Sequence, residues 1–159
     1  MFEELSLHIL DLAMNSLSAG ASLITIRVNE DPARDRWGLL VRDNGRGMDR
    51  ATLARVLSGH GSTKPGRRER IGLGLAFLQQ AAEACGGRFR IASLPGRGTA
   101  VAVRMQLSHV DRPPLGDLAG TVRTLCAAAP RARIRVDCRA GPEVFSFDSQ
   151  TAPPQPKTA

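Results

Sequence analysis

Residues 43–48 read Asp43-Asn44-Gly45-Arg46-Gly47-Met48, a glycine-bearing loop that directly follows an apolar strand predicted over residues 37–42. The pattern Asp-x-Gly-x-Gly by itself is most often an ordinary turn. An ionised aspartate at a strand end is also a pure hydrogen-bond acceptor, and beside glycines it can receive the exocyclic amine of adenine. The residues around the loop decide between these two interpretations.

A helix predicted over residues 4–19 carries one narrow polar stripe on an otherwise apolar surface. At 100° per residue the stripe spans about 80°, and it consists of His8, Asp11, Asn15 and Ser18. It is either the solvent face of the helix or, because a helix that is apolar almost all round is buried, a face turned toward a bound partner. Asp11 and Asn15 suit a hydrated magnesium ion, which prefers oxygen ligands. A carboxylate beside a triphosphate can also orient or deprotonate an attacking hydroxyl or water.

A second glycine motif, Gly72-Leu73-Gly74, opens a helix predicted over residues 71–85. Glycines at a helix N-terminus let phosphate oxygens approach free N–H groups and the positive end of the helix dipole; alternatively, they only allow close packing. Residues 58–70 before it are rich in glycine and basic side chains, which predicts a mobile surface loop. Lys64 and the loop arginines can close over phosphates. The P-loop pattern is absent, and Phe77 stands where the Rossmann pattern needs its third glycine.

The remaining segments predict the domain organisation. Further strands are expected over residues 22–29, 89–94 and 99–107, the last two joined by the hairpin signal Pro95-Gly96-Arg97-Gly98. Residues 1–108 therefore form the main domain. Residues 109–148 form a small extension of one helix and one hairpin, and the Pro- and Thr-rich residues 149–159 form a disordered tail.

Composition narrows the class of protein. With 159 residues, 42% of them hydrophobic, the chain is expected to fold as a globular domain. It has no apolar run of about 18 residues and no basic signal-peptide start, so we expect a cytoplasmic protein without a membrane partner. The net charge is +7, but the arginines are spread along the chain and aromatic residues are few. A polyanionic ligand is therefore expected rather than nucleic acid. Cys85, Cys126 and Cys138 lack CxxC spacing and are expected to be buried small hydrophobes.

In order and spacing, these motifs resemble those of the GHKL superfamily, the Bergerat-fold ATPases, over residues 5–107. The matching segments are Asp11 to Asn15 (N box), Asp43 to Met48 (G1 box), Ser62-Thr63-Lys64 (ATP lid), Gly72-Leu73-Gly74-Leu75 (G2 box) and Gly96-Arg97-Gly98-Thr99 (final glycine–threonine motif). The resemblance implies an α+β fold, a two-layer α/β sandwich (Bergerat fold) whose mixed, mainly antiparallel sheet carries helices on one face.

The same resemblance implies a pocket for ATP and Mg²⁺. Asn15 would hold the metal ion, Asp43 would bind the adenine amine, and Thr99 would support Asp43 through a water. Asp11, where the family usually has a glutamate, would be the catalytic carboxylate. The other nucleotide-binding residues would be Gly45, Gly47, Met48, Ser62, Thr63, Lys64, Gly72, Leu73, Gly74 and Leu75.

Three functions are compatible with this pattern. The chain could be a histidine-kinase-like or anti-sigma-like kinase acting on a separate protein, an ATPase that drives a partner's assembly, or a nucleotide-sensing module whose lid ordering switches a protein interaction. No dimerising helical hairpin with a phosphoacceptor histidine is evident, so the partner is expected to be a separate chain. Residues 5–11 and 107–117 resemble stand-alone bacterial proteins labelled histidine-kinase-like, often encoded beside iron-hydrogenase genes, which implies a regulatory or hydrogenase-associated partner.

Overall fold

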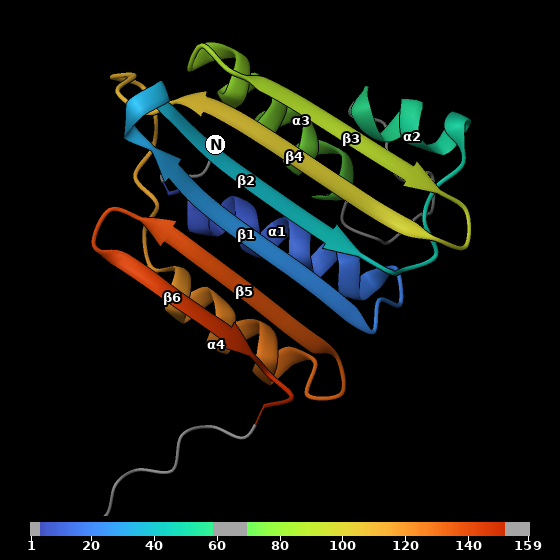
Figure 1. Cartoon of the computed structure of the whole chain (residues 1–159). Coiled ribbons are helices and arrows are strands. Elements are labelled where there is room, and N and C mark those ends of the chain that lie inside the picture. The colour runs from blue at the N-terminus through green and yellow to red at the C-terminus, as the bar shows by residue number, and fades with distance from the viewer. Residues whose placement is uncertain (1–3, 59–69, 152–159) are drawn as a thin grey trace, which may run out of the picture.

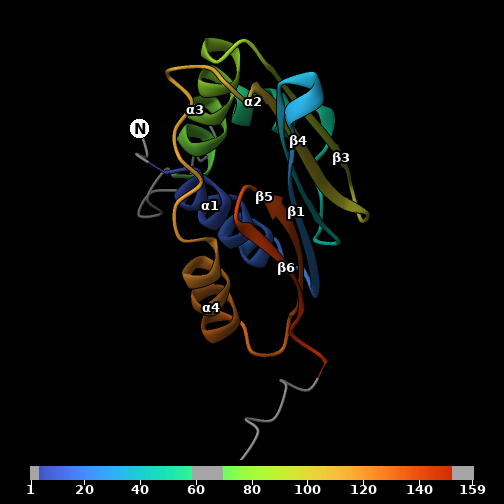
Figure 2. The same cartoon turned by 60° about the vertical axis from the view of Figure 1, so that its left-hand side comes forward.

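A single six-stranded sheet organises the chain, with α1, α3 and α4 packed on one of its faces (Figures 1 and 2). The computed structural model describes residues 4–58 and 70–151. In chain order the elements are α1 (Leu5–Ser18), β1 (Leu23–Asp31), η1 (Pro32–Arg34), β2 (Arg36–Asp43), α2 (Arg50–Leu57), α3 (Arg70–Ala84), β3 (Arg88–Leu94), β4 (Gly98–Gln106), α4 (Leu118–Ala128), β5 (Arg133–Ala140) and β6 (Glu143–Asp148).

The strands lie in the order β3-β4-β2-β1-β5-β6. Only β1 and β5 are parallel, and the other four neighbouring pairs are antiparallel. The predicted two-layer α+β sandwich with a mixed, mainly antiparallel sheet and helices on one face is therefore confirmed. β1 and β2 form a hairpin that turns through η1 and through Asp35, whose backbone is left-handed at φ 51°.

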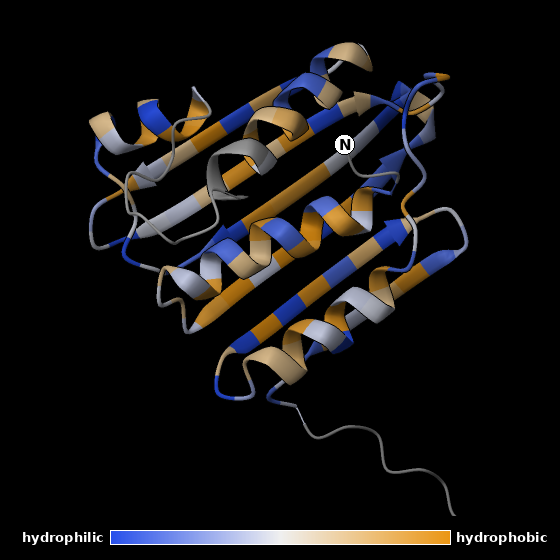
Figure 3. Ribbon diagram, turned by 180° about the vertical axis from the view of Figure 1, so that it is seen from behind, coloured by the Kyte–Doolittle hydropathy of each residue, from blue (hydrophilic) through white to orange (hydrophobic). Residues whose placement is uncertain are grey.

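The core lies between the sheet and the helices, and the period-two pattern of the strands places it there. In β1, Ile24, Ile26 and Val28 are at most 1% exposed, whereas Arg27 and Asn29 point to the other face. Trp37 of β2 is fully buried in the same layer. The helices supply the facing apolar side chains, with α1 crossing the middle of the sheet (Figure 3). The sheet face away from these helices keeps its polar side chains exposed.

Residues 109–148 extend the same sheet. β5 pairs with β1, with Ile24 opposite Ile134, and β6 forms the outer edge. α4 packs on α1, where Thr121 Oγ1 donates to the Ser6 carbonyl at 3.3 Å. α4, the helix predicted within residues 109–148, begins at Leu118, where the Asp117 carboxylate caps it by accepting the Gly120 N–H at 2.8 Å.

Cys85 and Cys138 are buried as predicted, and Cys126 is partly exposed. Burial raises the pKa of the Cys138 thiol to about 11, so this thiol is a packing group rather than a nucleophile at neutral pH. In the described part of the chain, no helix is both long enough and apolar enough to cross a membrane.

Candidate functional site

A pocket of about 200 Å³ opens between α1, α2 and the start of α3 on one side and the sheet on the other. Its walls are mainly apolar, and its polar groups come from α1, the end of β2 with the following loop, α2 and β4. The lining residues are Leu12, Asn15, Ser16, Ser18, Ala19, Val41, Asp43, Arg46, Gly47, Met48, Thr52, Val56, Leu75, Ile91, Thr99 and Val101. An apolar cleft with a few oriented polar groups is typical of a small-molecule site.

Asp43, the last residue of β2, is the carboxylate of this pocket, and two hydrogen bonds fix it. Ser16 Oγ donates to Oδ2 at 2.6 Å, and the Gly45 N–H donates to Oδ1 at 2.8 Å. A carboxylate has about four lone-pair positions, so these two donors leave acceptor capacity on both oxygens. Asp43 is thus a pre-oriented acceptor in an otherwise apolar cleft.

Two glycines let the loop after β2 approach the β3–β4 hairpin. Gly47 has φ +67°, and a Cβ there would overlap the carbonyl of Leu94. Gly98 has φ +108°, and a Cβ there would overlap the carbonyl of Asp43. Side chains are strained at positive φ and have no space at either position. Gly45 is also tightly enclosed, with Ala19 and the Asp43 carboxylate about 3.0 Å from a hypothetical Cβ.

Thr99 of β4 lies directly opposite Asp43 in the sheet register. Its hydroxyl shares a 2.8 Å hydrogen bond with Ser93 Oγ. Ser93 Oγ also accepts the Met48 N–H at 2.8 Å, so Thr99, Ser93 and Met48 form one polar chain along the wall of the pocket. The direct partner of Thr99 is therefore Ser93, whereas the hydroxyl that holds Asp43 belongs to Ser16.

The polar stripe of α1 turns inward, toward the pocket and α3. Asn15 and Ser18 line the pocket. Asp11 faces Gly74 of α3, where a Cβ would overlap its Oδ2 atom. His8 is only 1% exposed, and burial lowers its pKa. The stripe is thus not simply a solvent face, although Ser18 at its end is exposed.

α3 starts at Arg70, so Gly72, Leu73 and Gly74 lie in its first turns. Gly74 is the point of contact with α1, and Leu75, 4% exposed, forms part of the pocket wall. Ser62, Thr63 and Lys64 of the predicted lid lie outside the described residues. The structure describes the helical backbone, but not the side-chain surroundings, of Gly72 and Leu73.

Sequence reasoning missed Ser16 and Ser93. Ser16 follows Asn15 and lies about 100° around the helix from it, outside the predicted stripe. A serine within a helix carries no specific functional signal. Ser93 lies on the same face of β3 as the pocket residue Ile91, which its spacing of two residues could have indicated. Neither hydroxyl has a recognisable motif, because its importance depends on a partner far away in the chain.

The fold and pocket define a two-layer α/β protein with a nucleotide-type cleft, and solved structures include a similar fold. The "Aquifex aeolicus MutL ATPase domain complexed with ADP" matches with a TM-score of 0.58 and 14% sequence identity, over 95% of this chain and 66% of that chain. This chain therefore spans just under two-thirds of that structure, and at such low identity the match shows the fold alone. Comparison with curated proteins gave no match.

The family itself follows from the sequence model that matches residues 2–109, described as "Histidine kinase-, DNA gyrase B-, and HSP90-like ATPase". The chain belongs to this family, the GHKL ATPases. The matched range contains α1, the loop after β2, α3 and the β3–β4 hairpin, which together build the pocket. It ends before α4, so α4, β5 and β6 lie beyond the family domain.

Proposed function

We propose that this protein binds ATP with Mg²⁺ in the α1–β2–α3 pocket and uses it, as a histidine-kinase-like or anti-sigma-like kinase or as an ATPase, on a separate protein partner in cytoplasmic signal transduction. The carboxylate of Asp43, held by Ser16 and Gly45 in an apolar cleft, is the observation that carries the proposal.

Adenine fits this cleft chemically. Its ring is planar and apolar on both faces, and its exocyclic amine is a hydrogen-bond donor. The walls from Leu12, Val41 and Val101 accept the ring faces, while Asp43 supplies the matching acceptor. Guanine carries a carbonyl in place of this amine, which a carboxylate would repel. The cleft therefore favours adenine over guanine.

The phosphates would lie toward the start of α3, where Gly74 has no side chain of its own and packs against Asp11. The first N–H groups of a helix attract anions. The amide oxygen of Asn15, four residues from the carboxylate of Asp11, is the type of ligand that Mg²⁺ accepts. When bound, Mg²⁺ would neutralise phosphate charge. Asp11 would orient or deprotonate the attacking group.

The positions of His8 and His109, the two histidines that the structure describes, support a separate phosphoacceptor, while His60 lies outside the described residues. His8 is 1% exposed and is closed off from any phosphoryl donor. His109 follows the end of β4 opposite to Thr99, and its Nδ1 accepts the Asp111 N–H at 3.1 Å. Neither histidine lines the pocket.

Nucleotide binding is tested with the variants Asp43→Ala and Asp43→Asn in titrations with ATP, ADP and GTP. Asp43→Ala should reduce ATP affinity by roughly a hundredfold, since the partly buried acceptor proposed for the adenine amine is lost. Asp137→Asn, a carboxylate on the opposite sheet face, is the matched control. Unchanged ATP affinity in Asp43→Ala would show that the adenine assignment is wrong.

The step after binding is tested with γ-labelled ATP and cell extract. Transfer of label to a protein would support the kinase if Asp11→Asn abolishes the transfer but retains ATP affinity. Release of free phosphate that Asp11→Asn likewise abolishes would support the ATPase. If Asp11→Asn retains full turnover, Asp11 is not the base. If the wild-type protein binds ATP without either product, the nucleotide-sensing alternative replaces the proposal.

A further inference from the structure

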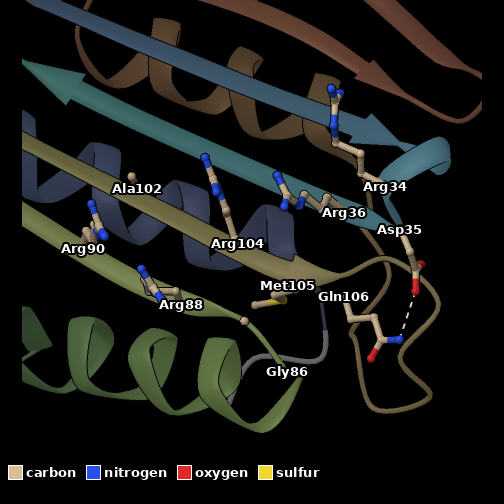
Figure 4. Close-up of a pocket in the computed structure, with 11 residues that line it drawn as sticks. Arg34, Asp35, Arg36, Gly86, Arg88, Arg90, Ala102, Arg104, Met105 and Gln106 are labelled. Atoms are coloured by element: carbon tan, nitrogen blue, oxygen red, sulfur yellow. Dashed lines mark hydrogen bonds between the residues drawn. The ribbon is translucent and has the colours of Figure 1, made fainter.

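The sheet face turned away from the helices carries a hollow of about 690 Å³ over β3, β4 and the start of β2 (Figure 4). Its floor includes Ala102 and Met105, and five arginines surround it: Arg34, Arg36, Arg88, Arg90 and Arg104. These residues come from two segments that are distant in sequence, η1 with the start of β2 and the β3–β4 hairpin. The fold therefore concentrates on one surface the charge that the sequence distributes along the chain.

This positive charge is not neutralised within the described residues. Arg34 pairs with Asp31 at 2.9 Å, but Arg36, Arg88, Arg90 and Arg104 have no carboxylate within 4.0 Å in the part of the chain that the structure describes. Arg88 lies directly opposite Arg104 in the antiparallel register. Like charges in such a pair repel each other, so this arrangement costs stability.

The one acidic residue at the hollow is already engaged. Asp35 accepts hydrogen bonds from Gln106 Nε2 at 2.9 Å, Ser108 Oγ at 2.7 Å and the Ser108 N–H at 2.8 Å. These bonds to Ser108 and Gln106 lower the pKa of Asp35. On β5, by contrast, Arg133 and Arg135 both pair with Asp148. Arg36, Arg88, Arg90 and Arg104 thus form, among the described residues, a cluster of unpaired charge over β2, β3 and β4.

The hollow is separate from the nucleotide pocket. The pocket lies on the helix-covered face at Asp43, and Arg36 lies at the opposite end of β2 on the open face. Arg36 and Asp43 are seven positions apart along β2, which corresponds to about 23 Å of extended strand. An anion in the hollow therefore cannot be the triphosphate of a nucleotide whose base contacts Asp43.

We propose that this arginine hollow is the docking surface for an acidic segment of the protein partner, with aspartates or glutamates at alternate positions. This proposal rests on the proposed function, because that function requires a protein partner. Guanidinium groups present planar donor pairs that match carboxylates. Arg88 and Arg90 are two residues apart on one face of β3, about 6.6 Å, which is the repeat of alternate side chains in an extended peptide.

A nucleic acid fits the same surface less well. Proteins that bind single strands stack bases on aromatic side chains. The aromatic residues of β2 and β3, Trp37 and Phe89, point to the helix side, where Trp37 is fully buried and Phe89 packs on the core. The open face therefore offers charge and a hollow, but no stacking surface.

The test measures binding of a fluorescent twelve-residue Glu-Ser repeat peptide by anisotropy, first without nucleotide and then with saturating ATP. Arg88→Gln/Arg104→Gln should weaken binding by about tenfold or more, since two charge-assisted contacts are lost. Arg123→Gln/Arg131→Gln removes the same charge from exposed sites elsewhere and should change binding less than about twofold. Unchanged ATP affinity in both variants shows that they remain folded.

Three outcomes would overturn the proposal. Equal weakening in both double variants would mean that the peptide senses only net charge. Displacement of the peptide by ATP would place it in the nucleotide pocket. Tighter binding of a single-stranded RNA or duplex DNA of matched charge, lost in Arg88→Gln/Arg104→Gln, would make nucleic acid the occupant. None of these readouts involves phosphoryl transfer, so failure here is distinguishable from failure of the proposed kinase or ATPase activity.

Discussion

Ser16 Oγ and Asp43 Oδ2 are joined by a 2.6 Å hydrogen bond that spans 27 residues of sequence. The bond joins α1 to the end of β2 inside the pocket. Ser16 Oγ also lies 3.2 Å from the Leu12 carbonyl, but its single proton is better placed on the nearer, charged acceptor. Ser16 thereby sets the orientation of the carboxylate on which the adenine assignment depends.

Ser16→Ala should weaken ATP binding by about tenfold, equivalent to about 1.4 kcal/mol, because the Asp43 carboxylate loses one of its two orienting donors. Isothermal titration with ATP measures the effect. Ser18→Ala, which removes a hydroxyl from the same helix and pocket without a hydrogen bond to Asp43, is the control and should bind ATP nearly as well as the wild type. Equal effects of the two substitutions would contradict the role given to Ser16.

Gly47→Ala should destabilise the protein by about 2 kcal/mol more than Gly96→Ala. Both glycines have positive φ, +67° and +75°, so both substitutions carry the backbone cost of about 1–2 kcal/mol. Only at Gly47 would the new Cβ overlap a backbone carbonyl, that of Leu94, whereas nothing lies within 4 Å at Gly96. The additional cost is that of overpacking.

Urea unfolding of the two variants measures this difference. A similar loss of stability in both would mean that the loop after β2 moves away from the hairpin without cost. In that case Gly47 is required for its backbone angle alone.

Asp148→Asn should lower stability at pH 7, and its difference from the wild type should disappear as the pH falls. Arg133, whose Nη2 atom lies 2.6 Å from Asp148 Oδ2, lowers the pKa of that carboxyl from 3.8 to about 2. Since the folded-state pKa is depressed, this contribution is fully present above about pH 4 and is lost as the pH falls toward 2. Unfolding midpoints measured from pH 7 to pH 2 test the pH range over which this stabilisation is lost. A difference between the two proteins that stays constant down to pH 2 would contradict this role of the Arg133–Asp148 pair.

Arg88→Glu should stabilise the fold while removing acidic-peptide binding. The substitution replaces a like-charged pair opposite Arg104 with an opposite-charged pair, a change worth about 0.2–1 kcal/mol. Thermal unfolding at low and high salt measures the gain, which should shrink as salt screens the pair. A loss of stability would show that the arginine stem packs on the sheet and that the position is structural.

Several features were predictable because each depends on neighbours in the sequence. Helix α1, strand β2, the cap at Asp49 and the hairpin between β3 and β4 follow from local periodicity and turn chemistry. The Asp49 carboxylate indeed accepts the Thr52 N–H at 2.7 Å and starts α2. The order and spacing of the glycine motifs likewise indicated the family from the sequence alone.

Other features depend on contacts between distant residues. The parallel pairing of β5 with β1 was not predictable, since the alternation in β5 fits either an independent hairpin or an added strand. The Ser93–Thr99–Met48 chain requires β3, β4 and the loop after β2 to be placed together. The same is true of the contact between Gly74 and Asp11.

The sequence alone pointed to the residues that we propose bind a nucleotide, because the Asp43 loop, the Asn15 helix and the Gly72-Leu73-Gly74 motif each carry their chemistry locally. Only the tertiary structure decided which serine orients Asp43 and where the arginines gather. Hydrogen bonds and electrostatic fields act through space, and a spacing of two residues along a strand says nothing about which strand lies beside it. Arg88 and Arg104 are 16 positions apart in the sequence, yet the sheet register makes them neighbours.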